Sequence, residues 1–230
     1  MDLQTLINRV RIIISEPEDD RVSDSDITGW LNDALDIISE RKVFSCTARI
    51  QLIEGQTEYI LPENFVDFCG KNSVKLESSG REYPVEFLTE PEMDSLEGYG
   101  NTYSAFTTGA RITAIKRENK IIFKNYTPGE DDNSIYLLIR YYRYHEYMEE
   151  ETDTPYRLLR TQHMCLIDYA VARFYEDDQE IQLSMRHDDK FFKYWLPRIE
   201  DHFTEKNLTH QKKITRASNL KRGFYGVVRR

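Results

Sequence analysis

The spacing of apolar residues changes twice along this chain, and that change constrains the fold more than any other feature. Near both ends, apolar residues recur every three or four positions, which is typical of amphipathic helices. Between about residues 44 and 148 they alternate in short runs that favour strands. The sequence therefore predicts an α+β fold. We expect a helical bundle of residues 1–43 and 149–207, an inserted β-rich lobe of residues 44–148, and an extended basic tail of residues 208–230.

Two helices are predicted in the first segment. Asp2 is placed to cap the first, and Ser23-Asp24-Ser25-Asp26 to open the second, because short polar side chains accept hydrogen bonds from a helix's first N–H groups. Pro17 and the acids after it should end the first helix. The apolar stripes comprise Leu3, Leu6, Ile7, Val10, Ile13 and Ile14, then Ile27, Leu31, Ala34, Leu35 and Ile38. We expect these two faces to pack together.

The middle segment predicts several short strands and one hairpin. Residues 112–115 and 121–124 flank the turn-forming run 117–120, which is a hairpin signature. A short helix is expected near residues 90–96. The other strands are expected at residues 48–53, 59–61, 74–76, 83–88 and 135–142.

Two further helices are predicted after the lobe. We expect the first to begin at Pro155 with Thr154 as its cap, and the second to run from about residue 183 to 206, with Pro197 kinking it or delaying its regular start. The apolar face of the first comprises Leu159, His163, Leu166, Ile167, Ala170, Val171 and Phe174. The core of the second is expected to comprise Phe192, Trp195, Leu196, Ile199 and Phe203.

Composition excludes several classes of protein. Hydrophobic residues make up 40% of the chain, enough for a core and too many for a disordered segment. No apolar run approaches the roughly 18–20 residues that span a bilayer, and the first residues lack the basic and apolar pattern of a secretory signal, so we expect neither. The three widely separated cysteines favour neither a disulfide framework nor a zinc site, so we expect a reducing compartment.

Charge is distributed unevenly along the chain. The net charge is −9, yet residues 208–230 contain seven basic residues and no acid. Apolar residues are interleaved with these cations, which favours a segment that orders against a partner, although a solvated terminus is the alternative. The residues expected to dock are Lys212, Lys213, Arg216, Lys221, Arg222, Phe224, Tyr225, Arg229 and Arg230.

Catalytic signatures are absent from the sequence. It has no phosphate-binding glycine loop, no nucleophile elbow and no H-E-x-x-H motif. The nearest approach to a metal site is His163, His187-Asp188-Asp189 and Asp201-His202, in the manner of an HD-type phosphohydrolase. The alternative, which we prefer, is one buried histidine and two surface histidines, with His187-Asp188 in an exposed turn. We therefore expect no enzyme activity, no metal and no cofactor.

Acidic loops and a tyrosine cluster are the remaining candidates for contacts. Asp131, Asp132, Glu149, Glu150 and Glu151 lie in two acidic runs, which are solvated loops unless an assembly uses them. Tyr and Arg are enriched at protein interfaces, so a surface formed by such residues is predicted, and a strand with one packed tyrosine face is the alternative. The cluster comprises Tyr141, Arg143, Tyr144 and Tyr147.

Several of these features together resemble the head-to-tail adaptor, or connector, proteins of tailed bacteriophages. The most specific is a G-x-x-x-Y-x-L-P-x-x-F segment, residues 55–65. The other matching features occur in the family's order. They are the opening helix pair with Trp30-Leu31-Asn32-Asp33-Ala34, the hairpin, the long strand and a helix at Tyr156–Tyr175. The resemblance covers roughly residues 1–207. The chain departs from the pattern at 98–110, which lacks a Gly-x-Pro, and in its longer tail.

The resemblance implies a non-enzymatic virion protein of the head-tail junction, assembled in the host cytoplasm. Such adaptors form a ring, usually of twelve copies, beneath the portal protein; the bundle makes ring contacts, the C-terminal segment reaches the portal, and tail components bind below. Double-stranded DNA passes through the lumen without specific binding, and no membrane is involved. The acidic residues named above are candidates for the lumen or subunit joints, since an acidic wall repels DNA.

Three other functions stay open at this point. Another tail or connector ring component would share the acidity and the lack of catalytic motifs. A nucleic-acid-binding module would use the basic tail as an arm, and its binding would weaken steeply with salt. A metal hydrolase would bind a transition metal and lose it when His187 and Asp188 are replaced.

Overall fold

The computed structural model describes residues 1–15, 21–70, 72–78, 80–89, 112–123, 126–129, 135–155 and 157–204. The chain divides into two compact units. A helical unit combines Met1–Phe44 with the described residues from His145 onward, and a sheet unit comprises Ser45–Tyr144. The fold is α+β, as the sequence predicts. Within the described part of the chain, every helix is too short or too polar to cross a bilayer.

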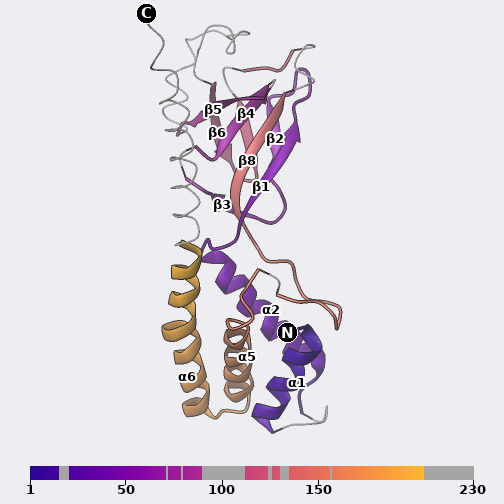
Figure 1. The fold of residues 1–230 in the computed structure, drawn as a ribbon, viewed down its shortest axis with the longest axis vertical. Helices are drawn as coiled ribbons and strands as arrows, with labels where there is room; N and C mark the ends of the chain where they lie inside the picture. Colours follow the sequence, from indigo (N-terminus) through magenta and orange to yellow (C-terminus); the bar gives the residue numbers. More distant parts are fainter. Residues whose placement is uncertain are drawn as a thin grey trace, which may run out of the picture. The chain divides into compact units, whose positions relative to one another are not determined.

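The described part of the helical unit consists of α-helices and a π-helical segment (Figure 1). The α-helices are α1 (Leu3–Ile14), α2 (Asp24–Glu40), α5 (Met164–Asp177) and α6 (Ile181–Asp189). The π-helix η2 (Lys190–Trp195) continues α6, and residues 196–204 are again α-helical. Helix α5 contacts α1, α2 and α6, so it is the centre of this unit.

Both predicted caps of the first two helices are confirmed. Asp2 accepts a hydrogen bond from the Thr5 N–H at 2.8 Å, and Ser23 and Asp26 form a reciprocal capping box. The α2 stripe from Ile27 to Ile38 is fully buried. One residue of the α1 stripe was misplaced: Ile13 is 39% exposed, because the buried face follows Val10 to Ile14.

The predicted start of the third helix is wrong. Helix α5 begins at Met164, nine residues after Pro155, and its N-cap is His163 rather than Thr154. The residues before it form turns, in which the Leu159 N–H donates to Gln162 Oε1 at 2.9 Å and the Gln162 N–H donates to the Leu159 carbonyl. Leu159 is 42% exposed as a result. Local side-chain bonds of this kind compete with helix formation.

The fourth helix begins at Ile181, two residues before the predicted start, and η2 interrupts it. The interruption before Pro197 confirms that the helix is irregular there. It also changes which face is buried: Phe191 is fully buried, whereas Phe192, expected in the core, is 41% exposed. Phe191 and Leu196 are five residues apart and both buried. A π-helix brings such residues to one side, whereas an α-helix separates them by about 140°.

The sheet unit is an eight-stranded, curled sheet (Figure 1). Its strand order is β1-β8-β4-β5-β6-β7-β2, with β3 also paired to β8. Neighbours are antiparallel except β5 and β6, which are parallel. The strands are β1 (Ser45–Gln51), β2 (Glu58–Ile60), β3 (Phe65–Phe68), β4 (Val74–Ser78), β5 (Arg81–Phe87), β6 (Ile112–Arg117), β7 (Lys120–Phe123) and β8 (Tyr136–Arg143).

The strands that the sequence predicts are present, including the β6–β7 hairpin. Strand β3 was missed because its four residues are all half-buried and show no alternation. The helix expected at residues 90–96 lies outside the described residues. Core side chains come from the inward faces of several strands, including Leu76, Leu137, Ile139 and Ile121.

The segment that carries the resemblance has structural roles in the sheet unit. The buried Tyr59 hydroxyl accepts from the Ile53 N–H at 3.1 Å and donates to the Gln56 carbonyl at 3.0 Å, which closes the turn before β2. Leu61 is in the core, and the Phe65 ring stacks on Tyr141 with centroids 5.7 Å apart. Burial raises the pKa of Tyr59. This motif therefore stabilises the fold through buried contacts.

Candidate functional site

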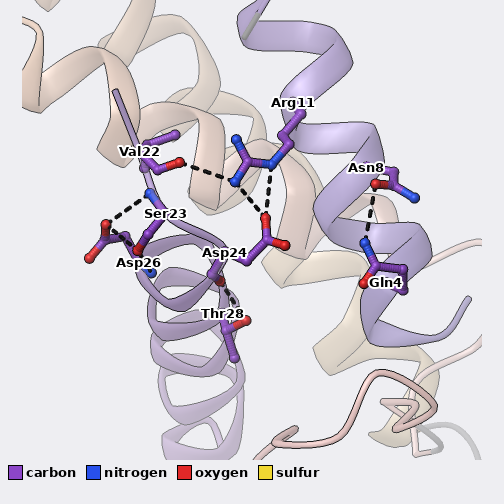
Figure 2. Close-up of polar contacts among 8 residues, drawn as sticks. All are labelled: Gln4, Asn8, Arg11, Val22, Ser23, Asp24, Asp26 and Thr28. Carbon is purple, nitrogen blue, oxygen red and sulfur yellow. Dashed lines mark hydrogen bonds and ion pairs between the residues drawn. The ribbon is translucent and has the colours of Figure 1, made fainter. Parts of the chain in front are cut away.

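Arg11 joins α1 to the start of α2 through a buried guanidinium group (Figure 2). Its Nε and Nη2 donate to Asp24 Oδ1 at 2.8 and 2.5 Å, and Nη2 also donates to the Val22 carbonyl at 3.1 Å. Arg11 is 7% exposed, and a buried cation needs such partners because desolvation penalises an unpaired charge. The contacts fix the junction at which α2 begins.

Replacing Arg11 with alanine is expected to lower the free energy of unfolding by about 1–2 kcal/mol. The loss is moderate because the Asp24 side chain is about half exposed and can be rehydrated. Urea denaturation followed by circular dichroism would measure it. Arg9→Ala, an exposed position on the same helix, is the control and should cost less than about 0.5 kcal/mol. Equal losses for the two variants would contradict the role given to Arg11.

A surface pocket of about 390 Å³ lies beside this junction, where the start of α2 meets the end of α5. Trp30 of α2 and Phe174 of α5 line it with aromatic rings, and the buried Val22 also contributes. Its polar residues are Arg21, Asp26, Asp177 and Asp178. Residues far apart in the sequence thus form one concave surface.

The pocket is acidic. Arg21 pairs with Asp178, and its guanidinium carbon lies 5.5 Å from the centre of the Phe174 ring. Hydrogen bonds from the Ser23 hydroxyl and backbone N–H hold the pKa of Asp26 below its ordinary value. Three carboxylates against one guanidinium give the pocket a charge of −2 at neutral pH. Such a surface suits a cation rather than an anion.

A second polar cluster, centred on Asp168 of α5, is buried in the helical unit. Asp168 is 8% exposed, and its carboxylate lies 2.9 Å from His187 Nδ1, 3.3 Å from Lys190 Nζ and 2.8 Å from Trp195 Nε1. Burial by itself would raise the pKa of Asp168, but the bonds from His187 and Trp195 and the Lys190 charge outweigh it and hold the pKa below its ordinary value. The π-helix brings Lys190 and Trp195 to the same carboxylate.

The residues considered as metal ligands do not converge. His187 faces Asp168, whereas Asp188 accepts hydrogen bonds from Arg173 Nη2 at 2.6 and 2.7 Å. His163 Nδ1 lies 3.0 Å from the Met1 amino group, and burial together with that charge lowers the pKa of His163. Among the described residues, no group of three or more His, Cys, Asp or Glu side chains is arranged to hold a metal. The exposed turn expected at His187 is wrong: His187 lies on α6, with 13% of its side chain exposed.

The acidic loop at residues 149–153 contacts the start of α1. Asp153 Oδ2 accepts from the Glu149 and Glu150 N–H groups at 2.9 and 2.8 Å, and the Asp153 carbonyl accepts from the Leu3 N–H at 2.8 Å. These bonds hold the pKa of Asp153 below its ordinary value. The Glu149, Glu150 and Glu151 residues themselves are exposed. Asp153 therefore shapes the loop, and the three glutamates are presented to solvent.

The residues of the tyrosine cluster differ in exposure. Tyr141 and Arg143 are 4% and 8% exposed, and the Tyr141 hydroxyl donates to Asn64 Oδ1 at 3.0 Å. Tyr144 is half-buried, and its N–H donates to the Asn64 carbonyl. Tyr147, in the helical unit, is 57% exposed, and its hydroxyl donates to Asp36 Oδ2 at 2.8 Å. Tyr147 is thus the residue of the cluster that is most available to a partner.

Some predicted site residues lie outside the described part of the chain. They are Asp131 and Asp132 and the tail residues Lys212, Lys213, Arg216, Lys221, Arg222, Phe224, Tyr225, Arg229 and Arg230. The acidic pocket, in contrast, was missed. Its acids were read separately, Asp26 as part of a helix cap and Asp177-Asp178 as a loop, because nothing local in the sequence shows that α2 and α5 bring them together.

Comparison with known families gives a match over most of the chain. A family model described as SU10 adaptor protein matches residues 1–201. The match includes both helical segments and the whole sheet unit. A comparison with curated proteins found no match.

Proposed function

This chain belongs to the SU10 adaptor protein family, and from that premise we propose that it forms a ring beneath the portal of a tailed bacteriophage. The family match over residues 1–201 carries the proposal. A chain of this family is a structural component of the virion that assembles with other head or tail proteins. In this proposal the portal protein is the partner and the ring has about twelve copies. The ring assembles in the host cytoplasm, and the protein has no catalytic role.

The acidity of the chain supports a channel for DNA. Residues 1–207 carry 24 basic and 40 acidic side chains, so a ring of such subunits has a strongly negative body. In this proposal the exposed Glu149, Glu150 and Glu151, together with Asp131 and Asp132, face the lumen or the subunit joints. Negative walls repel the phosphate backbone and let the duplex slide.

Ring contacts are assigned to the helices. Residues 1–43 and 149–207 would act as one bundle against the neighbouring subunits, with residues 44–148 as an inserted lobe. Tyr147 is exposed and has a polar end held by Asp36, which suits a side chain at a protein interface. Tyr144, in the sheet unit, is assigned to a partner contact of its own. The buried Tyr141 and Arg143 would support it from within their own subunit.

The basic tail is assigned to the portal. Its seven cations and its aromatic residues would order against an acidic groove, as segments that fold on binding do.

Co-assembly with the portal ring tests whether the protein binds the portal and whether the basic tail makes that contact. Mixing the two proteins and class-averaging negatively stained particles should show an added layer beneath the portal. A chain shortened to residues 1–207 should lose most of that density, and a full-length chain with Lys212, Lys213, Arg216, Lys221 and Arg222 changed to Ser should behave like it. Unchanged binding by both variants would overturn the tail assignment. No added density, with a portal still competent for another partner, would instead assign the protein to a more distal tail component.

A further inference from the structure

One carboxylate in the acidic pocket lacks a partner within the described chain. Asp178 is paired with Arg21, and Asp26 is engaged in the capping box with Ser23. Asp177 is exposed, and the described residues supply it with no hydrogen bond or ion pair. Its negative charge therefore lies at the surface pocket, beside two aromatic rings, with no cation bound to it among the described residues.

The position of Asp177 is unfavourable for the helix that carries it. The C-terminal end of a helix has partial negative charge, so acidic residues there are destabilising. Helix α5 nevertheless ends in Glu176-Asp177 and is followed by Asp178, and its last turn has no basic residue. A cation supplied by another chain would offset this repulsion.

The pocket already shows how it holds a cation. The Arg21 guanidinium is paired with Asp178 while it lies near the face of Phe174. Trp30 presents a second ring, and indole is the aromatic group that cations prefer. A second cationic side chain therefore finds a carboxylate, Asp177 or Asp26, and a ring in the same cavity.

We propose that this pocket receives a lysine side chain from the basic C-terminal segment, residues 208–230, of a second copy of this chain. That segment has seven cations and no acid, which complements a pocket of charge −2. Seven cations exceed what one pocket holds, so this contact is compatible with docking of other tail residues on the portal. It does not depend on the portal.

Geometry favours a neighbouring copy over the chain's own tail. The continuous helical run from Ile181 to residue 204 leads away from the end of α5 over about 36 Å, at 1.5 Å per residue. A chain's own tail would have to reverse direction and run back along that length, whereas a tail that continues in the direction of the helix leads away from its own pocket. The 26 residues after Thr204 span up to about 85 Å, which is long enough to reach another subunit.

Cross-linking of the full-length protein tests the proposal. Equal amounts of unlabelled and ¹⁵N-labelled chain would be mixed and treated with a zero-length carbodiimide, which joins a carboxylate to a lysine in direct contact. We expect cross-links from Lys212, Lys213 or Lys221 to Asp26, Asp177 or Asp178 in peptides that mix the two isotopes. Peptides of one isotope only would show contact within a chain and overturn the proposal. So would reaction of those lysines with other carboxylates alone.

Asp177→Asn is the variant of choice because this residue has no structural partner among those described. The yield of the mixed cross-links to Asp26 and Asp178 should fall about two- to fivefold, the range expected for one exposed charge pair. Its thermal midpoint should be unchanged or slightly raised, since a charge at the wrong helix end is removed. Asp201→Asn removes the same charge from an exposed helical position and is the matched control. Equal yields from both variants would overturn the role of Asp177.

Discussion

Replacing Phe191 with alanine is expected to lower the free energy of unfolding by about 3–5 kcal/mol, the largest single effect that we predict. Phe191 is fully buried, and its ring packs on Tyr169 with centroids 5.0 Å apart. Its loss would leave a cavity between η2 and α5 that the neighbouring side chains fill only in part. Urea denaturation monitored by helical circular dichroism measures the change.

The adjacent residue supplies a matched control. Phe192 is 41% exposed, so Phe192→Ala removes the same atoms from a site already in contact with water and should cost less than about 1 kcal/mol. In a regular α-helix, Phe192→Ala would cost more than Phe191→Ala. Phe192 lies four residues before Leu196 and seven before Ile199, so regular α-helical spacing would place it on their buried face. A larger loss for Phe192→Ala would therefore contradict the π-helix itself.

Asp168→Ala is expected to cost about 2–4 kcal/mol, because it removes the acceptor that three donors share. The largely buried His187 and Trp195 N–H groups would lose their partner, whereas the exposed Lys190 can be rehydrated. The donors come from α6 and η2, so the change should loosen this segment from α5. Hydrogen exchange would locate the loss at residues 187–195. Asp189→Ala is the control: its ion pair with Lys193 is exposed, and its loss should cost less than about 0.5 kcal/mol. Similar losses for the two variants would contradict a central role for Asp168.

The same carboxylate makes stability depend on pH. The folded-state pKa of Asp168 is lower than that of the unfolded chain, so its contribution is present above the unfolded pKa of about 4 and is lost as pH falls through the folded pKa. Comparing wild type with Asp168→Asn at neutral pH and at about pH 3 tests this. The difference in unfolding free energy between them should shrink in acid. A difference that is constant with pH would show that the charge of Asp168 contributes nothing.

Local patterns account for much of the fold. The Asp2 and Ser23-Asp26 caps, the buried stripe of α2 and the β6–β7 hairpin each depend on residues within a few positions of one another. Such features are set by helix periodicity, capping bonds and turn chemistry, which a sequence displays directly. Predictions failed where a local bond or a change of helix type intervened. The Gln162 turn delays α5, and η2 exchanges the burial of Phe191 and Phe192.

The candidate sites, like the fold, were predicted in part from local sequence features and in part became visible only in the folded chain. Composition, periodicity and short motifs were enough to predict the α+β class, the acidic body, the basic tail and a resemblance to phage adaptors. The folded chain was needed to show that Tyr141 is buried, that Asp168 binds three donors, and that Asp26 and Asp177 line one pocket. The reason is physical: each of these depends on contacts between segments far apart in the sequence, and the packing of whole helices and strands sets such contacts.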